Sequence, residues 1–338
     1  MHDLMRWILL IPVVILAALA VWTGWFLWQP LPVDCPVSVL IPAGGGLSDI
    51  QDILMEHGIV PRDYRFAATA WLSGSSRKLR AGEYLVEPGM TPLDLLDNMV
   101  AGRVIRHHLT IPEGLTMKQI ADRFAEAGWI DRQRFLALAS DAGFIRRLGL
   151  QVDRLEGYLF PDTYTLVRGE TSESMIISMM VRRFLQVWQE ISRQEHPPEG
   201  LNRHELVTLA SLVEKETGQA DERPRVARVF LNRIKRGMRL QSDPTVVYDL
   251  PDFDGTIRRQ DLRRHSPYNT YRIIGLPPGP ICSPGRAALE AVLHPARSDA
   301  LYFVARRDGT HQFSTTLKEH NRAVQRYQRM PIRSHNGN

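Results

Sequence analysis

The longest hydrophobic segment of the chain lies near its N-terminal end. Residues 7–28 contain no charged side chain. At about 1.5 Å per residue, a helix of this length spans roughly 33 Å, which is enough for the hydrocarbon core of a bilayer. Trp7 stands at one end of the segment and Trp22, Trp25 and Trp28 at the other, where interfacial aromatic side chains are expected. The pattern predicts one transmembrane helix over residues 7–28.

A cleaved signal peptide is the alternative interpretation of this segment. Its apolar region would be shorter and would be followed by small residues at the cleavage site, whereas bulky side chains continue past Ala20. Arg6 precedes the span and Asp34 follows it, which favours a cytoplasmic tail over residues 1–6 and an exported body. We therefore expect an uncleaved anchor.

After a proline-rich linker over residues 29–36, one pattern occurs three times. Each copy consists of a strand, a turn with proline and glycine, a short amphipathic helix and a glycine stop. The helices are expected at residues 47–57, 92–100 and 117–127. Units of this kind pair two strands and lay helices on one face, so residues 37–105 are predicted to form a small α/β module.

From residue 106 to residue 335 the pattern predicts a larger α+β body. A strand at residues 301–305 is expected to pair with residues 312–314 across the turn at Asp308 and Gly309. The predicted fold class is therefore α+β, with one N-terminal transmembrane helix, a small module and a larger domain. The helices expected in the larger domain are Met117–Ala127, Asp131–Ala139, Ser172–Ser192, Arg203–Thr217, Ala220–Gly237 and Thr316–Met330.

The helix at residues 203–217 ends in two candidate acids. Its apolar face, on a wheel of about 100° per residue, contains Leu206, Leu209, Leu212 and Val213. Glu216 lies roughly 60° from the centre of that face and Glu214 roughly 100°. With Gly218 as the C′ residue, Glu216 occupies the last turn, where burial and the helix dipole both raise a carboxyl pKa. Glu216 is the better candidate for a general acid, although a solvated surface glutamate is the commoner situation.

Composition narrows the possible partners of this chain of 338 residues. Its net charge of +5 suits an acidic partner, but the basic residues are scattered and no nucleic-acid-binding motif is present. No CxxC pair occurs, and the histidines lack the spacing of metal ligands. We expect no metal, no cofactor and no nucleic acid. Whether Cys35 and Cys282 pair is left open by their distance in sequence.

Several blocks, in the same order, resemble the YceG-like family of endolytic murein transglycosylases. Residues 209–217 look like the active-site helix of that family. The further similar blocks are residues 156–164, 237–246, 268–271, 275–279, 294–295, 302–305, 311–317 and 320–321. Residues 37–105 resemble the LysM-like module that precedes the catalytic part in some cell-wall enzymes, so the resemblance covers nearly the whole chain.

The resemblance implies a reaction and a place for it. The family's catalytic glutamate corresponds to Glu216 here. A lytic transglycosylase cleaves the MurNAc–GlcNAc β-1,4 bond without water and forms 1,6-anhydro-MurNAc, so that one carboxyl serves as acid and then as base. The resemblance further implies a protein of the inner membrane whose body faces the periplasm. Its expected partners are nascent glycan strands, whose elongation it terminates, and peptidoglycan synthases.

The remaining roles are less specific. Six polar or aromatic residues of the similar blocks are candidates for substrate binding, although each could equally form a turn or a buried hydrogen bond. These residues are Tyr158, Asp162, Asn269, Tyr271, His320 and Asn321. Glu156 and Glu214 are possible helpers but not the main acid.

Two other functions are compatible with the same residues. A muramidase would cleave the same bond with water. A non-enzymatic scaffold would bind the cell wall through the LysM-like module, which could also serve only to position the larger domain.

Overall fold

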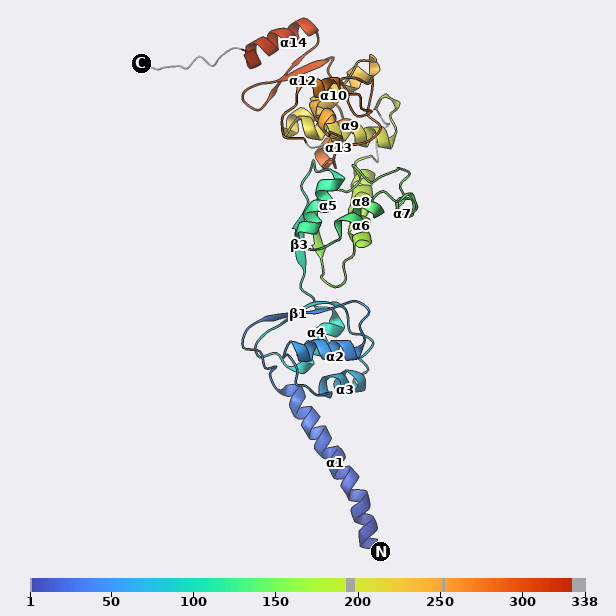
Figure 1. The fold of residues 1–338 in the computed structure, drawn as a ribbon, viewed down its shortest axis with the longest axis vertical. Coiled ribbons are helices and arrows are strands. Elements are labelled where there is room, and N and C mark those ends of the chain that lie inside the picture. The colour runs from blue at the N-terminus through green and yellow to red at the C-terminus, as the bar shows by residue number, and fades with distance from the viewer. Residues whose placement is uncertain (1, 193–197, 251–252, 330–338) are drawn as a thin grey trace, which may run out of the picture. The chain divides into compact units, whose positions relative to one another are not determined.

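A computed structural model describes residues 2–192, 198–250 and 253–329, and Figure 1 follows the chain by colour from α1 to α14. The chain forms two compact units. The first ends at residue 109, the second begins at residue 110, and residues 164–171 belong to the first unit. Strand β3 (His107–Thr110) leads into the second unit and pairs with β4 (Thr163–Leu166), which leads back. The domain boundaries expected from the sequence, 37–105 and 106–335, stay a prediction.

Helix α1 (His2–Trp28) contains the predicted membrane span. Its segment from Ile11 to Trp28 is long and apolar enough to cross a membrane, judged by length and composition. At the C-terminal end of the helix, Phe26 is buried in the core of the first unit. The guanidinium of Arg65 lies 4.5 Å from the centre of that ring, a distance typical of a cation–π contact. The orientation of α1 in a membrane stays a prediction.

The first unit is built on an antiparallel strand pair. Strands β1 (Val37–Ile41) and β2 (Gly82–Val86) place Val39 opposite Tyr84. Alternate side chains of both strands are buried, as the period of two in a strand requires. Further residues of this core come from α2 (Leu47–Glu56), α3 (Arg65–Leu72) and α4 (Pro92–Ala101).

Helix α9 (Arg203–Glu216) lies inside the second unit. Every residue from Leu206 to Val213 is buried, and α9 contacts α10 (Arg223–Lys235) and α13 (Arg286–Leu293), which also contact each other. At the N-terminal end, the Asn202 side chain accepts a hydrogen bond from the Glu205 N–H at 3.1 Å, and Glu205 accepts one from the Asn202 N–H at 2.8 Å. This reciprocal cap fixes where the helix begins.

The other elements surround this helical core. Helix α8 (Glu173–Ile191) contacts α13 and α6 (Arg132–Leu138), and α6 contacts α5 (Met117–Glu126). Strands β5 (Tyr302–Ala305) and β6 (His311–Ser314) form an antiparallel pair. Helix α14 (Leu317–Val324) contacts both strands. Shorter helices are α7 (Ala142–Arg147), α11 (Asp243–Val247) and α12 (Arg259–Arg263), with 3-10 turns at Pro198–Gly200 and Ala220–Glu222 and a π turn at Gln325–Arg329.

Most of the predicted helices are confirmed, with ends that differ by one residue at most. Two expectations were wrong in detail. The segment expected as one helix from Ala220 to Gly237 is a 3-10 turn followed by α10, and the helix expected from Thr316 to Met330 leaves the α form after Val324. Five helices and one strand were not expected, namely α3, α7, α11, α12, α13 and β4. They are at most eight residues long, and helices this short depend on tertiary packing rather than on a local pattern.

Gly157 provides a test of the packing beneath α9. Its φ of +83° lies in the left-handed region, and a Cβ added there would stand 2.5 Å from the Cβ of Pro280. We expect Gly157→Ala to lower the free energy of unfolding by about 3 kcal/mol, because backbone strain and a steric clash add. The measurement is thermal unfolding of the full chain in detergent, followed by circular dichroism.

Gly149 is the matched control. It has the same φ of +83° with no atom within 4 Å of an added Cβ, so Gly149→Ala should cost only about 1 kcal/mol of backbone strain. Equal losses in the two variants would show that the contact with Pro280 does not constrain this turn.

Candidate active site

Helix α9 delivers Glu216 to the edge of the core. Glu216 is the last helical residue, and Thr217 continues in an extended conformation with φ −144°. The prediction that Glu216 occupies the last turn is confirmed. Gly218 is not in the left-handed conformation expected of a C′ glycine, because the chain leaves the helix directly into extended backbone. The side chain of Glu216 is partly buried while Lys215 is exposed, as the helical wheel predicts.

Glu216 lies in a polar pocket of about 370 Å³. The Ser242 hydroxyl donates a hydrogen bond of 2.5 Å to its Oε1. Burial raises the pKa of Glu216 to about 7, the hydrogen bond from Ser242 opposes this rise, and the negative charge of Asp243 adds to it. A carboxyl with this pKa exchanges its proton near neutral pH, as a general acid must.

The position of Ser242 is set by Thr270. The Ser242 N–H donates to the Thr270 Oγ1 at 2.9 Å, and the Gln241 N–H donates to the Thr270 carbonyl at 3.2 Å. Gln241 has a φ of +51°, a left-handed conformation that is uncommon for a residue other than glycine. The backbone therefore turns sharply just before Ser242 and is held there by two hydrogen bonds.

A buried cation lies beside the acid. Arg233 of α10 is 7% exposed and lines the pocket of Glu216. Its guanidinium donates to the carbonyls of Leu240 at 2.6 Å and Leu301 at 2.7 Å. Its charge lowers the pKa of Glu216, because a nearby cation favours the ionised carboxyl. Arg233 therefore favours the ionised form of Glu216.

A hydrogen-bonded histidine also faces this pocket. Glu222 accepts hydrogen bonds from the His311 backbone N–H at 2.7 Å and from the His311 Nδ1 at 2.6 Å. A carboxylate that accepts from Nδ1 places the ring hydrogen on that nitrogen and orients the imidazole. His311 lines the pocket with Glu216, so Glu222 acts as its positioning residue.

Glu214, the other acid of the motif, has a structural role in this arrangement. It is 6% exposed and lies 3.3 Å from the Arg223 guanidinium. Its Oε2 accepts the Gly285 N–H at 3.0 Å. Arg223 also lies 3.7 Å from Glu113. Glu214 therefore joins the end of α9 to the beginning of α10 and α13, while Glu216 faces the pocket.

The structure brings two of the six predicted substrate-binding residues next to Glu216. Tyr271 and His320 line the same pocket, and the Tyr271 hydroxyl donates to the Asp243 Oδ1 at 2.6 Å. The ring of His320 stacks on Tyr302 with centroids 5.2 Å apart, and burial lowers the pKa of His320. Their contact with a substrate stays a prediction.

The other four predicted residues lie elsewhere. Tyr158 is buried and its hydroxyl is 2.9 Å from the His204 Nδ1. Asp162 forms an ion pair of 2.7 Å with Arg183. Asn269 is fully buried, and its amide donates to three backbone carbonyls. Asn321 is exposed on α14 and is not among the residues that line the pocket of Glu216.

Sequence reasoning missed Ser242, Arg233 and His311 as parts of the site. Ser242 and His311 lie inside blocks that resemble the family, so polar residues in those blocks were the available signal. Arg233 lies within a helix whose pattern carries no such signal. In the described parts of the chain, no group of three or more His, Cys, Asp or Glu side chains is placed to hold a metal ion.

The two cysteines are both free thiols. Cys35 is exposed, whereas Cys282 is buried. The Sγ of Cys282 donates to the Ser211 carbonyl of α9 at 3.3 Å, and burial raises the pKa of this thiol. Cys282 is therefore a packing residue of the helical core.

A carboxyl of raised pKa at the edge of a polar pocket defines a candidate acid–base enzyme. The model of the YceG-like family matches residues 39–326 of the chain. The chain therefore belongs to the YceG-like family.

Two curated relatives carry the same name. The endolytic murein transglycosylase of Bacillus subtilis (strain 168) is 33% identical over 321 residues, which cover 90% of this chain and 89% of the relative. The endolytic murein transglycosylase of Streptococcus pneumoniae (strain ATCC BAA-255 / R6) is 33% identical over 334 residues, which cover 87% of this chain and 59% of the relative. This chain thus spans nearly all of the first relative and less than two thirds of the second.

A solved structure is also similar. The crystal structure of a YceG-like protein from Listeria monocytogenes is 35% identical, with a TM-score of 0.59. The match covers 86% of this chain and 99% of that chain. The mixed α and β fold of this chain is therefore that of a known YceG-like structure.

The raised pKa of Glu216 predicts how substitution of this residue changes the stability of the protein. With a pKa of about 7 against an ordinary 4.5, the folded state binds more protons than the unfolded state between these values. Stability is therefore lost as the pH rises from 4.5 to 7. We expect the free energy of unfolding of Glu216→Gln to exceed that of the wild type by about 2 kcal/mol at about pH 8. The difference should vanish near pH 4.

Melting temperatures of the two proteins over this pH range are the measurement. Glu126→Gln is the control, because Glu126 is an exposed carboxyl at the end of α5. A stability difference that does not depend on pH would contradict a raised pKa at Glu216.

Proposed function

We propose that this protein is a membrane-anchored endolytic murein transglycosylase with Glu216 as its catalytic acid and base. It cleaves the MurNAc–GlcNAc β-1,4 bond within nascent glycan strands, leaves 1,6-anhydro-MurNAc ends and so terminates elongation. The observation that carries the proposal is the position of Glu216. A carboxyl with a pKa of about 7 opens onto a polar pocket, in a chain whose relatives carry this name.

The reaction needs two proton transfers. Protonated Glu216 first gives its proton to the oxygen that leaves the MurNAc anomeric carbon, and the bond to that oxygen breaks. The MurNAc 6-hydroxyl oxygen then bonds to the same carbon, and its proton passes to the Glu216 carboxylate. The acid is thereby regenerated, and one carboxyl suffices where hydrolysis normally uses two.

The residues around Glu216 suit these steps. Ser242 donates to Oε1, so the transferable proton belongs on Oε2. The buried charge of Arg233 favours the carboxylate that is present between the two transfers. Tyr271 and His320 line the same pocket and are placed to contact the sugars.

The transmembrane anchor places the proposed reaction at the membrane. Helix α1 is long and apolar enough to span the inner membrane, and Arg6 before the span with Asp34 after it favours a cytoplasmic N-terminus and a periplasmic body. An enzyme held at the membrane meets glycan strands as they emerge. Peptidoglycan synthases are therefore the proposed protein partners.

Product analysis is the test of the reaction. The full chain in detergent is incubated with uncross-linked glycan strands, and the fragments are identified by mass spectrometry. We expect internal cleavage with 1,6-anhydro ends for the wild type, and a loss of at least about a thousandfold in rate for Glu216→Gln, because the substituted amide cannot donate the required proton.

The other outcomes identify the alternatives. Reducing ends would make the protein a muramidase that uses water. Cleavage that persists in Glu216→Gln would exclude this residue as the acid. If neither protein cleaves strands at protein concentrations where both bind them, the scaffold would be favoured.

The pH dependence of the rate is expected to report the pKa of Glu216. Because the acid must be protonated, kcat/KM should fall as the pH rises through about 7. Ser242→Ala removes a hydrogen bond that lowers this pKa, so the falling limb should move to higher pH. Asp243→Asn removes a charge that raises it, so the limb should move to lower pH. Shifts in the same direction would contradict this assignment.

A further inference from the structure

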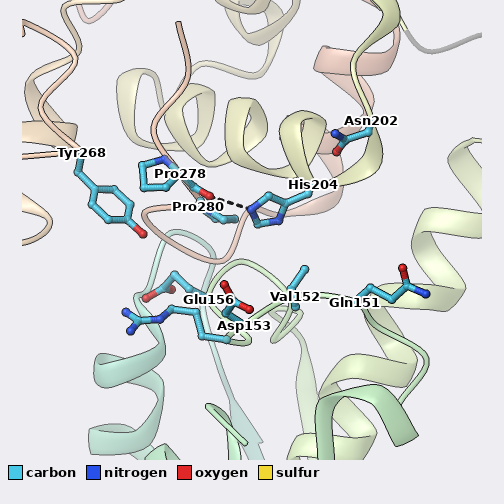
Figure 2. Close-up of a pocket in the computed structure, with 11 residues that line it drawn as sticks. Gln151, Val152, Asp153, Glu156, Asn202, His204, Tyr268, Pro278 and Pro280 are labelled. Atoms are coloured by element: carbon cyan, nitrogen blue, oxygen red, sulfur yellow. Dashed lines mark hydrogen bonds between the residues drawn. The ribbon is translucent and has the colours of Figure 1, made fainter. Parts of the chain in front are cut away.

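A second pocket of the second unit lies at the other end of α9. This pocket, here called the α9 N-terminal pocket, has a volume of about 560 Å³, within the range of ligand sites in proteins. Figure 2 shows Asp153 and Glu156 on a loop that faces Tyr268, Pro278 and His204. Glu216 does not line this pocket, and the proposed mechanism uses none of these side chains.

The walls of the pocket are fixed by hydrogen bonds. The His204 Nε2 is 3.0 Å from the Pro278 carbonyl, which can only accept, so Nδ1 accepts from the Tyr158 hydroxyl at 2.9 Å. On the facing loop, Glu156 accepts from the Met117 N–H and the Tyr248 hydroxyl, both at 2.9 Å. The pocket is thus formed without any ligand.

The rim of the pocket offers exposed polar groups. Asp153 and Arg154 are exposed and line the opening. The ring of Tyr268 lines the same pocket and packs against Tyr248 with centroids 4.6 Å apart. An aromatic ring beside a carboxylate and a guanidinium combines a face for the apolar side of a sugar ring with a donor and an acceptor for its hydroxyls.

Two chain segments run from this pocket to the pocket of Glu216. Helix α11 begins at Asp243, which lines the Glu216 pocket, and Tyr248 follows its last residue beside the α9 N-terminal pocket. These two residues are separated by about 8 Å along a helix. Tyr268 lines one pocket and Tyr271 the other.

The turn that contains the two tyrosines is held by hydrogen bonds of Asn269. Asn269, between them, donates to the carbonyls of Asp261, Leu262 and Arg264, and its Oδ1 accepts the Tyr271 N–H at 3.0 Å. These hydrogen bonds hold the turn between Tyr268 and Tyr271, each of which lines one of the two pockets. His204, on the far side, lies about 18 Å from Glu216 along α9.

We propose that the α9 N-terminal pocket binds sugar units of the glycan strand that lie beyond the bond cleaved at Glu216. This inference rests on the proposed function. A strand cut internally extends past the catalytic pocket in both directions, and binding energy from its distant part holds the scissile bond in place. Asp153, Arg154 and Tyr268 supply these contacts, and the substrate they select is a long strand.

The test compares long strands with short fragments that fill only the Glu216 pocket. For the full-length Asp153→Ala/Arg154→Ala variant we expect KM for long strands to rise about tenfold with kcat unchanged, because hydrogen bonds to the distant sugars are lost. Short fragments should be cut with the KM of the wild type. Tyr268→Ala, checked by its melting temperature, should act in the same direction.

Arg146→Ala is the matched control, because Arg146 is an exposed arginine of α7 that does not line the pocket. It should leave both KM values unchanged. An unchanged KM for long strands in the double variant, or an equal rise for both substrates, would overturn the proposal. A rise that disappears when the stem peptides are removed from the strands would assign the pocket to peptide and would also overturn it.

Binding separates this proposal from the reaction itself. In a Glu216→Gln background, association of fluorescent long strands is measured by anisotropy, and Asp153→Ala/Arg154→Ala should weaken it about tenfold. This result does not require cleavage. If the wild type proves not to be a transglycosylase, the α9 N-terminal pocket is still supported by weakened binding and refuted by unchanged binding.

Discussion

The packing of α9 against α10 and α13 determines where the second unit can carry chemistry. Residues 206–213 are all buried, and the charged side chains of this helix lie at its two ends. At the C-terminal end the same packing holds the carboxyl of Glu216 partly out of water. Burial is also the largest cause of its raised pKa. The packing that forms the hydrophobic core therefore also raises the pKa of Glu216.

A buried network of hydroxyl groups completes the site. Thr245 donates to the Ser242 carbonyl at 2.6 Å and stands 2.8 Å from the Thr270 hydroxyl, which in turn accepts the Ser242 N–H. These groups are fully or almost fully buried, and a buried network keeps one geometry because an unpaired member would be costly. The short contact between Ser242 and Glu216 depends on this network, although only Ser242 touches the acid.

The helix and its acid were predictable from the sequence because their signal is local. The apolar pattern of residues 206–213 and the position of Glu216 in the last turn can be read from one short segment. Ser242, Arg233 and His311 come from three other segments, and only tertiary packing brings them to Glu216. A local sequence pattern does not predict tertiary contacts of this kind. Asn269 was predicted to bind substrate because it is a polar residue in a block similar to the family. In the structure its amide donates to three backbone carbonyls. Asparagine suits this turn-holding role as well as it suits substrate binding, so the residue type alone could not decide between them.

Glu156 and Glu216 show that a raised pKa does not by itself identify a catalytic acid. Burial raises the pKa of both carboxyls to about 7. Glu156 is only 4% exposed, and each of its oxygens accepts a hydrogen bond, from Met117 and from Tyr248. These bonds tie together the beginning of α5, the loop before Tyr158 and the end of α11. Glu216 accepts at Oε1 from Ser242 and opens onto a pocket, so its second oxygen can meet a substrate. Both carboxyls line pockets. They differ in their hydrogen bonds, because both oxygens of Glu156 accept one, whereas Glu216 accepts from Ser242 at Oε1.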